Sequence, residues 1–430
     1  MDKLDFISLP IDVLVNIIKN LSYSDVLNVM LTCKYLNILI RDDNVLWRLI
    51  SSKYLIIQRD PFNIFSFNWY NKCRISSNWI KGIYRNKIIL LHSMKYMPWL
   101  CLQDECFFLT VGPQLWCFGT NRLGMPECSV CYWRLTLPRT VRHDVRTNDI
   151  SRFKVRDSYV ACGNRDGCVT VFKYDNVKRR PNLQYKANDC HLNGKVEVTA
   201  VELITRDDNC TIISGSNNEP CLKMWKPPDE IDDEYWPKTM ECMRKIAIPE
   251  CSGVKCMHLN NDQDKLAVGL DGNSQPIVLD AETGAFVMES DSFNQASQAI
   301  RDIQWHDRNT IAIVSHSGVL QCFDTRSSQM IYSAVDPFRS TLYCVRTDGQ
   351  AAILVGSSEY CRCVLFDNRI ASRHKQVYFT QKKSSPVYCL DFDSTKLVAA
   401  ADRGIAALEF DVSVHNTYAK DYSETFEVYA

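Results

Sequence analysis

About 84 residues at the start of the chain carry apolar side chains at the three- and four-residue spacing of α-helices. In the stretch SLPIDVLVNIIKNLSYSDVLNVMLTC, residues 8–33, further aliphatic residues widen the main apolar stripe. Ser22 with Asp25 three positions later, and the run Asp42–Asn44, are residue types that begin helices. The pattern predicts short helices with more apolar surface than they can bury among themselves. Residues 62–82 predict one or two further helices with an aromatic face.

From about Arg85 onward the pattern changes to short runs rich in Val, Ile, Tyr, Phe and Cys, separated by Gly, Asn, Asp and Ser. Such runs are typical of strands and turns. They form seven groups, most of them with four runs, and the groups recur with a mean period of about 45 residues. This period is that of the four-stranded blades of a WD-repeat propeller. The sequence therefore predicts a seven-bladed β-propeller.

The two ends of the repeat region predict how the ring closes. The last group lacks a fourth run, while the run NKIILLHS, residues 86–93, precedes the first group without a group of its own. An unclosed ring would leave unpaired strand edges at its first and last blades. We therefore expect residues 86–93 to form the outer strand of the last blade, beside IAALEFD.

Two recurring tetrapeptides support the WD-repeat interpretation. Phe323–Arg326 reads FDTR and Phe366–Arg369 reads FDNR, 43 residues later. Both resemble the Trp-Asp-x-Arg of WD repeats with Phe in place of Trp, and Met224–Trp225 stands at the same place in an earlier group. No group has a clear Gly-His pair, so the repeats are degenerate.

The composition limits the function classes. The chain has 430 residues, of which 46% are hydrophobic, and its 50 Lys and Arg balance its 50 Asp and Glu. Zero net charge argues against a general nucleic-acid or membrane-surface binder. No segment has the apolar length of a membrane span, and residues 2–12 do not read as a signal peptide. We expect a protein of the cytoplasm, with the nucleus as a second compartment, whose 20 cysteines are reduced thiols.

The N-terminal helices resemble an F-box, whose pattern is Leu-Pro, an acidic residue, spaced aliphatic residues, a Cys and a Trp. The resemblance implies that the helices bind an adaptor of the Skp family, which recruits cullin and RING subunits, and the alternative is a plain helical cap on the propeller. The residues that carry the resemblance, and that it assigns to adaptor binding, are Leu9, Pro10, Asp12, Val13, Leu14, Ile17, Leu21, Leu27, Cys33, Leu36 and Trp47.

Over most of its length the chain is similar to the F-box/WD-repeat family, notably in Asn78–Trp79, Met97–Leu100, Ser340–Gly349 and Ser384–Leu390. The resemblance implies an α+β multidomain chain. Its parts are an all-α F-box at 1–50, a helical linker at 51–84, an all-β seven-bladed WD-repeat propeller at 85–415 and a C-terminal tail at 416–430. The chain departs from the family in its weaker WD signatures and in an acidic insert, Pro227–Lys238. We expect that insert to be a solvated loop.

Positive residues in the turns of one propeller face are the candidate substrate-binding groups, because relatives hold their substrates on that face. A guanidinium pairs with phosphate in a bidentate manner, so this set admits a phosphorylated substrate, although single surface charges are more often only solvated. The candidates are Arg165, Lys195, Arg339, Lys382, Lys383 and Arg403.

Catalytic and metal signals are weak. The chain has no GxxxxGK[ST], GxGxxG, HExxH or GxSxG motif, and its eight histidines are scattered. Cys128 and Cys131 form a lone CxxC that Cys117 and His143 would have to complete, so we expect no metal and no cofactor.

Two hypotheses for the function remain after these exclusions. The chain is either the non-catalytic substrate receptor of an SCF-type (Skp–cullin–F-box) ubiquitin ligase, which directs a protein substrate to proteasomal degradation, or a WD-repeat scaffold without ubiquitin transfer. A third hypothesis, a nucleic-acid-binding propeller, conflicts with the neutral charge.

Overall fold

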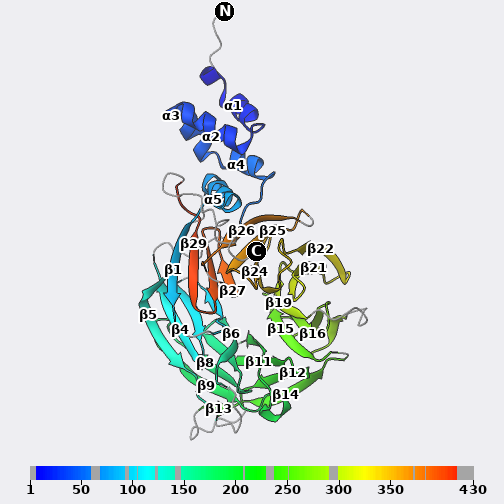
Figure 1. Ribbon diagram of the computed structural model, residues 1–430. Coiled ribbons are helices and arrows are strands. Elements are labelled where there is room, and N and C mark those ends of the chain that lie inside the picture. The colour runs from blue at the N-terminus through cyan, green and yellow to red at the C-terminus, as the bar shows by residue number, and fades with distance from the viewer. Residues whose placement is uncertain are drawn as a thin grey trace, which may run out of the picture.

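A helical unit stands on one face of a ring of β-sheets in the computed structural model (Figure 1). The structure describes residues 6–59, 68–92, 96–103, 105–121, 124–140, 147–206, 209–228, 237–249, 251–289, 299–370, 373–382 and 384–413. The helical elements are η1 (Phe6–Ser8), α1 (Ile11–Ile18), α2 (Tyr23–Thr32), α3 (Lys34–Asp42), α4 (Asn44–Ser51) and α5 (Trp69–Lys81), and within the ring η2 (Leu192–Gly194).

The predicted helix starts are confirmed. Ser22 precedes α2, and its hydroxyl oxygen accepts a hydrogen bond from the backbone N–H of Asp25 at 3.3 Å. Asp43 precedes α4 and accepts from the N–H groups of Val45 and Leu46 at 3.0 and 2.9 Å. These side chains satisfy N–H groups that have no partner inside the helix. Pro10 lies immediately before α1, where its missing N–H costs nothing.

Seven sheets form the ring, and each blade begins with its innermost strand. Blades 1 to 4 consist of β2 (Leu100–Leu102), β3 (Cys106–Val111), β4 (Gln114–Thr120) and β5 (Pro126–Thr136); β6 (Ile150–Arg156), β7 (Tyr159–Asn164), β8 (Val169–Lys173) and β9 (Asn182–Ala187); β10 (Ala200–Arg206), β11 (Asn209–Ser216), β12 (Glu219–Lys226) and β14 (Glu241–Ala247); β15 (Gly253–Leu259), β16 (Lys265–Asp271), β17 (Ile277–Asp280) and β18 (Phe286–Met288). Blades 5 to 7 consist of β19 (Ile300–Trp305), β20 (Thr310–Ser315), β21 (Val319–Asp324) and β22 (Gln329–Val335); β23 (Leu342–Thr347), β24 (Ala352–Ser357), β25 (Arg362–Asp367) and β26 (His374–Phe379); β27 (Val387–Phe392), β28 (Lys396–Ala401), β29 (Gly404–Glu409) and β1 (Arg85–Leu91).

The ring closes as the sequence predicts. β1 pairs antiparallel with β29, with Arg85 opposite Glu409 and Lys87 opposite Ala407, so the N-terminal strand completes the last blade. One strand was not predicted. β13 (Lys238–Thr239) pairs in parallel with β9 and gives blade 2 a fifth strand.

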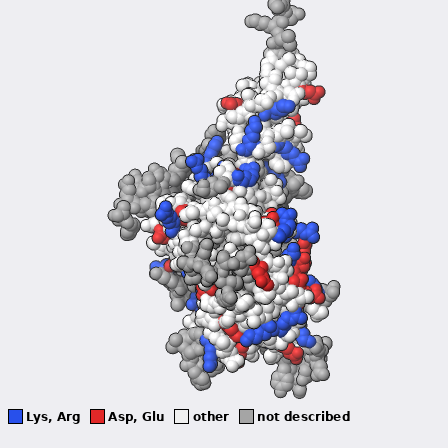
Figure 2. Space-filling view, turned by 90° about the vertical axis from the view of Figure 1, so that its right-hand side faces the viewer, with Lys and Arg blue, Asp and Glu red and all other residues white. Residues whose placement is uncertain are grey.

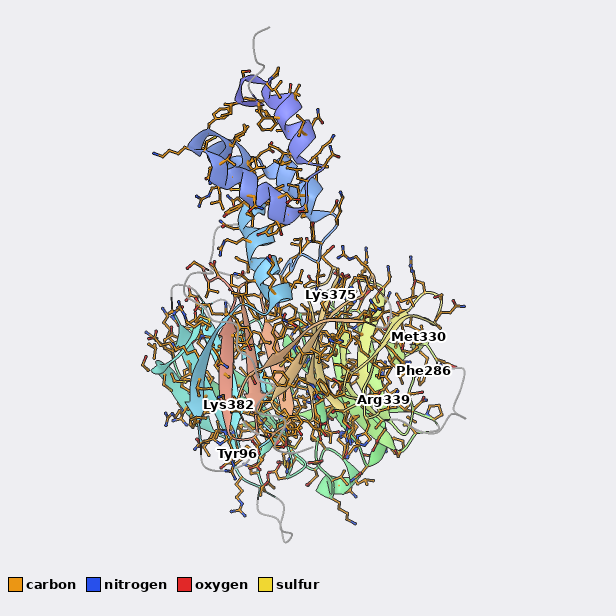
Figure 3. All side chains as sticks on the ribbon, turned by 45° about the horizontal axis from the view of Figure 1, so that its top comes forward. Tyr96, Phe286, Met330, Arg339, Lys375 and Lys382 are labelled. Atoms are coloured by element: carbon orange, nitrogen blue, oxygen red, sulfur yellow. The ribbon has the colours of Figure 1, made fainter. Side chains whose placement is uncertain are left out.

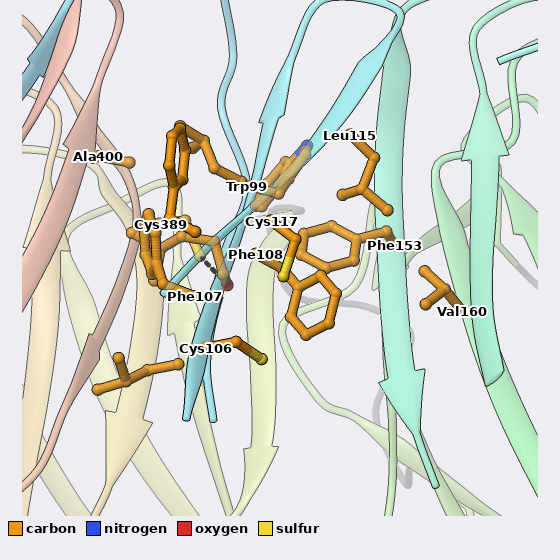
Figure 4. Close-up of a cluster of buried hydrophobic side chains, with 14 of the residues drawn as sticks. Trp99, Cys106, Phe107, Phe108, Leu115, Cys117, Phe153, Val160, Cys389 and Ala400 are labelled. Atoms are coloured by element: carbon orange, nitrogen blue, oxygen red, sulfur yellow. Dashed lines mark hydrogen bonds between the residues drawn. The ribbon is translucent and has the colours of Figure 1, made fainter. Parts of the chain in front are cut away.

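Aromatic and small apolar side chains fill the space between neighbouring blades. In the cluster of blade 1, Phe107, Phe108 and Cys117 are fully buried, and Phe153 from blade 2 packs against them (Figure 4). Cys389 from blade 7 donates to the carbonyl oxygen of Leu100 at 3.5 Å. Interlocking of this kind ties the first blade to both of its neighbours.

The degenerate WD signatures still make local contacts. Arg326 donates to the carboxylate of Asp324 at 2.7 Å, and Arg369 donates to that of Asp367 at 2.8 Å. The pKa of Asp324 falls to about 2 because Arg326 stabilises its charged form. Each pair lies at the end of the third strand of its blade.

Blade 3 contains a buried hydrogen-bond chain that sequence analysis missed. Trp225 donates its indole N–H to the hydroxyl of Ser214 at 2.9 Å. That hydroxyl lies 2.9 Å from Nε2 of His191, and Nδ1 of His191 lies 2.7 Å from the carboxylate of Glu219. His191 is not preceded by Gly, so it does not match the Gly-His pair of WD repeats and could not be identified from the sequence.

The linker helix fixes the helical unit to blades 6 and 7. The fully buried indole of Trp79 stacks on Phe410 at 3.6 Å between ring centroids and donates to the carbonyl of Ser394 at 2.7 Å. Arg59 forms an ion pair with Asp391 at 2.7 Å. All of these contacts lie on the face where the innermost strands end. In the described part of the chain, no helix combines the length and hydropathy needed to span a membrane.

Candidate functional site

Many apolar side chains are exposed on the outside of the helical unit. They come from η1 and from α1 to α4, and the side chain of Leu31, at 81%, is the most exposed of them. Isolated exposed aliphatic residues are common, but so many within about 45 residues mark an interaction surface. We call these residues the apolar helical surface: Phe6, Ile7, Ile11, Val13, Ile17, Leu31, Tyr35, Ile38, Val45 and Leu49.

The residues predicted to bind an adaptor fall into three groups by exposure. Leu14, Leu36 and Trp47 are buried in the core of the helical unit, where the indole N–H of Trp47 donates to the carbonyl of Ile40 at 2.8 Å. In this conformation they support the surface and do not lie on it. The exposed group is Pro10, Asp12, Val13 and Ile17, and the half-buried group is Leu9, Leu21, Leu27 and Cys33.

Most of the apolar helical surface was not singled out from the sequence. Leu31 and Val45 stand next to buried positions of the same helices, and Ile38 stands between two half-buried ones, so spacing alone assigns them to a widened stripe. The available signal was the surplus of aliphatic residues over one helical face. That surplus predicts a surface but does not say which residues form it.

A narrow channel runs through the centre of the ring. It encloses about 210 Å³ and is lined by residues on the innermost strand of every blade. Several of its charges are paired across blades, and Lys154 and Glu202 lie 2.6 Å apart. The carboxylate of Asp302 lies 3.2 Å from Arg346 and 3.6 Å from Arg152. These pairs tie the innermost strands together.

A second cavity of about 150 Å³, which shares Trp99 and Arg152 with the channel, lies at the face opposite the helical unit, and we call it the channel mouth. Four cations and a single carboxylate, that of Glu197, line it. Two of the cations are held by aromatic rings, since Arg152 lies 3.6 Å from the ring centre of Trp99 and Arg301 lies 5.4 Å from that of Tyr343. The four cations are Arg152, Arg165, Lys255 and Arg301.

Among the predicted substrate-binding residues that the structure describes, only Arg165 lies in the channel mouth. Its Nε lies 3.8 Å from the carboxylate of Glu197, and 37% of its side chain is exposed. Lys195, Arg339, Lys382 and Arg403 are exposed in turns of the same face but do not line the cavity, and Lys383 lies outside the described residues. Figure 3 labels Lys382 and Tyr96 on the side of the ring turned away from the helices.

Three cations of the channel mouth were missed. Arg152, Lys255 and Arg301 lie inside β6, β15 and β19, close to the start of each strand. A sequence search that is restricted to the turns between strands does not identify them. Their signal was a cation near the start of the innermost strand in several blades.

The candidate zinc ligands do not form a cluster in the described part of the chain. Cys117 is buried, and a hydrogen bond with Cys106 together with burial raises the pKa of its thiol. Burial also raises the pKa of Cys128, so both stay protonated and bind zinc poorly. His143 and most of the acidic insert lie outside the described residues.

One other group of potential metal ligands lies in blade 3. His191, Glu219 and Cys221 meet there within ligand distance, but both nitrogens of His191 are engaged by Glu219 and Ser214. We interpret this group as part of the hydrogen-bond chain that holds the blade.

The fold and these two surfaces define a two-part architecture, in which a helical unit with exposed apolar side chains is fixed to a seven-bladed propeller. Residues 6–53 match the F-box-like family. The chain is similar to F-box/WD repeat-containing protein 4 from Mus musculus, at 23% identity over 79% of this chain and 77% of the relative. The protein of the same name from Homo sapiens is 22% identical over 79% of this chain and 76% of the relative.

A solved structure, that of the computationally designed Ika8 protein, aligns with 75% of this chain and 98% of its own. Its sequence identity to this chain is 12% and its TM-score is 0.49. The resemblance to F-box/WD-repeat proteins that the sequence suggested is confirmed by the family match and by the two relatives.

Proposed function

We propose that this chain is the substrate-recognition subunit of an SCF-type ubiquitin ligase. In this proposal the apolar helical surface binds a Skp-family adaptor, which brings cullin and RING subunits, and the propeller holds a protein substrate. The observation that carries the proposal is the apolar helical surface itself, on a unit that matches the F-box-like family over residues 6–53. An adaptor would bury ten exposed apolar side chains that the propeller leaves uncovered.

The placement of the two surfaces suits a receptor. The helical unit is anchored through Trp79 and Arg59 to the face where the innermost strands end. The channel mouth opens on the opposite face. A substrate held there does not compete with an adaptor bound to the helices.

The chain would act by proximity and not by chemistry of its own. Holding the substrate beside a ubiquitin-conjugating enzyme raises the effective concentration of the reacting groups. The proposed place of action is the cytoplasm, with the nucleus as a second compartment, and the proposed outcome is proteasomal degradation of the substrate.

Co-purification with a purified Skp-family adaptor tests the proposal. The Val13→Glu/Ile17→Glu double variant places two charges on exposed positions of α1 and should abolish adaptor binding. Val287→Glu, at a 48% exposed position of β18 in the propeller, is the matched control and should bind like the unmodified chain. Adaptor binding that survives the double variant contradicts the proposal. Adaptor binding without cullin recruitment would favour the scaffold alternative.

A further inference from the structure

The channel mouth contains one cation that lacks a carboxylate partner. Among the described residues, three of its four cations form ion pairs, and Arg301 does not. The three ion pairs are Arg152–Asp302 at 3.6 Å, Arg165–Glu197 at 3.8 Å and Lys255–Asp271 at 3.9 Å. Arg301 instead donates to Nδ1 of His316 at 2.9 Å, and a ring nitrogen that accepts belongs to a neutral imidazole. One further carboxylate would give every cation of the mouth an opposite charge.

Apolar groups lie beside these cations. The ring of Tyr343 lies under the guanidinium of Arg301 and meets the ring of Tyr388 edge-on at 5.4 Å between centroids. Met97 is 40% exposed, and its sulfur lies 3.2 Å from the guanidinium of Arg165. Positive charge and apolar surface therefore occur within one small cavity. An occupant that matches both carries a carboxylate and an apolar side chain close together.

Three residues that line the mouth have a buried polar atom without a hydrogen-bond partner in the described part of the chain. Nε1 of Trp99 and Nε of Arg301 are donors, and Oδ1 of Asn217 is an acceptor. Buried polar atoms cost free energy when they stay unpaired. The last residue of a polypeptide supplies groups of the complementary kind, because its carboxylate accepts hydrogen bonds and its backbone N–H donates one.

The size of the mouth favours the end of a chain over a loop. Its volume of about 150 Å³ is small beside the roughly 300 Å³ at which pockets for drug-sized ligands begin. A loop would need room for two chain segments, which lie about 4.8 Å apart even as paired strands. A chain that continued through the ring would enter the channel among ion pairs such as Lys154–Glu202. A chain that ends in the mouth avoids both costs.

We propose that the channel mouth binds the C-terminal carboxylate of a polypeptide whose last residue is apolar. Arg301 pairs with the carboxylate, and the apolar side chain lies against the apolar groups of the wall. A phosphorylated side chain matches this site less well, since it brings a charge of about −1.5 to −2 and no apolar surface. The flank of the ring in Figure 2 offers no comparable place, because positive and negative residues are mixed over it. The inference rests on the proposed function, in which the chain end belongs to the substrate.

Two libraries of random octapeptides test the proposal, one with a free C-terminal carboxylate and one with a C-terminal amide. The purified full chain is immobilised, and the retained peptides are quantified and sequenced by mass spectrometry. We expect at least about tenfold more retention from the carboxylate library, because the amide removes the charge that Arg301 would pair with. Apolar residues should be enriched at the last position of the retained peptides.

A pair of variants locates the binding. Arg301→Gln removes the charge and should lower retention of the carboxylate library by about tenfold or more. Lys382→Gln removes an exposed charge from the same face outside the cavity, so it is the matched control and should retain both libraries like the unmodified chain. The melting temperatures of the two variants should agree. If Arg301→Gln fails to fold, the comparison of the two libraries on the unmodified chain decides.

Three outcomes overturn the proposal: equal retention from the two libraries, no retention from either, or retention that Arg301→Gln leaves unchanged. Enrichment of Asp or Glu at internal positions of both libraries would assign the mouth to an acidic side chain in place of a chain end. These results are distinguishable from a failure of the proposed function, because the libraries contain no adaptor. A chain that binds the adaptor without preferring the carboxylate library refutes this inference alone, and a chain that shows the preference without binding the adaptor refutes the ligase proposal alone.

Discussion

At the scale of single residues, His191 links the stability of blade 3 to pH. Burial lowers its pKa to about 4, although its hydrogen bonds with Glu219 and Ser214 act in the opposite direction. Burial alone would raise the pKa of Glu219, but hydrogen bonds led by His191 lower it to about 2. The two directions agree on one state at neutral pH: a neutral imidazole beside a charged carboxylate.

This state predicts a loss of stability on acidification. An unfolded chain protonates His191 near pH 6.5, whereas the folded chain does so only near pH 4, so the unfolded state binds more protons between these values. The free energy of unfolding should fall as pH drops from 6.5 towards 4, by at most about 1.4 kcal/mol per pH unit for this group. Glu219 should add a further loss from pH 4.5 towards 2.

Urea unfolding at pH 7 and pH 5 measures the effect. His191→Asn should be less stable at both values and should show a smaller difference between them, because the titrating group is gone. His374→Asn, at an exposed position of β26, is the control and should keep the full difference. An equal pH dependence in the His191→Asn variant would contradict the assignment.

Residue-scale prediction from the sequence succeeded where a signal is local. The caps Ser22 and Asp43 could be identified because a cap depends on neighbours three residues away. Arg301 could not be identified, since its role depends on strands from other blades that converge at the channel mouth. Leu14 and Leu31 lie on helices of similar pattern, and only the packed unit buries the first and exposes the second.

At the scale of elements, the strands of the seven blades could be predicted from the sequence, whereas the additional strand β13 could not. Alternating short runs and turn residues identify the strands of all seven blades. The spare run before the first group and the missing fourth run in the last group identify the closure by β1. β13 has two residues and follows the acidic insert, so it carries no strand pattern. The attachment of α5 to blades 6 and 7 involves contacts across some 300 positions of sequence, which no local pattern encodes.

We expect Trp79 to contribute most of the free energy that holds the helical unit on the propeller. Its side chain is fully buried, stacks on Phe410 and donates to Ser394, whereas Trp69 in the same helix is only partly buried. Trp79→Ala should lower the free energy of unfolding by about 3–5 kcal/mol, and Trp69→Ala by clearly less. Chemical unfolding followed by circular dichroism compares the two variants, and equal losses would show that Trp79 is not the anchor.

At the scale of the whole molecule, the helical unit and the channel mouth lie at opposite faces of the ring. Neutral overall charge hid the concentration of four cations at the channel mouth, because their charge is balanced by carboxylates elsewhere in the chain. The composition argues against a general polyanion binder, but it carries no information on where charges converge in the fold. The fold brings cations from three blades to one opening, opposite the helices.

From the four cations in the channel mouth we predict how replacing two of them should change substrate capture. If the substrate presents phosphate or a cluster of carboxylates, each charge-assisted contact is worth about 1.5–3 kcal/mol, so Arg165→Ala/Arg301→Ala should weaken binding by a factor on the order of a hundred or more. Lys195→Ala/Lys382→Ala removes two exposed cations of the same face that do not line the cavity, and this control should have little effect. The measurement is capture of proteins from proteasome-inhibited cells, with and without phosphatase treatment, alongside adaptor binding, which should stay unchanged in both variants. Equal capture by the two double variants would exclude the channel mouth as the anion-binding site, and capture that phosphatase does not reduce would indicate carboxylates in place of phosphate.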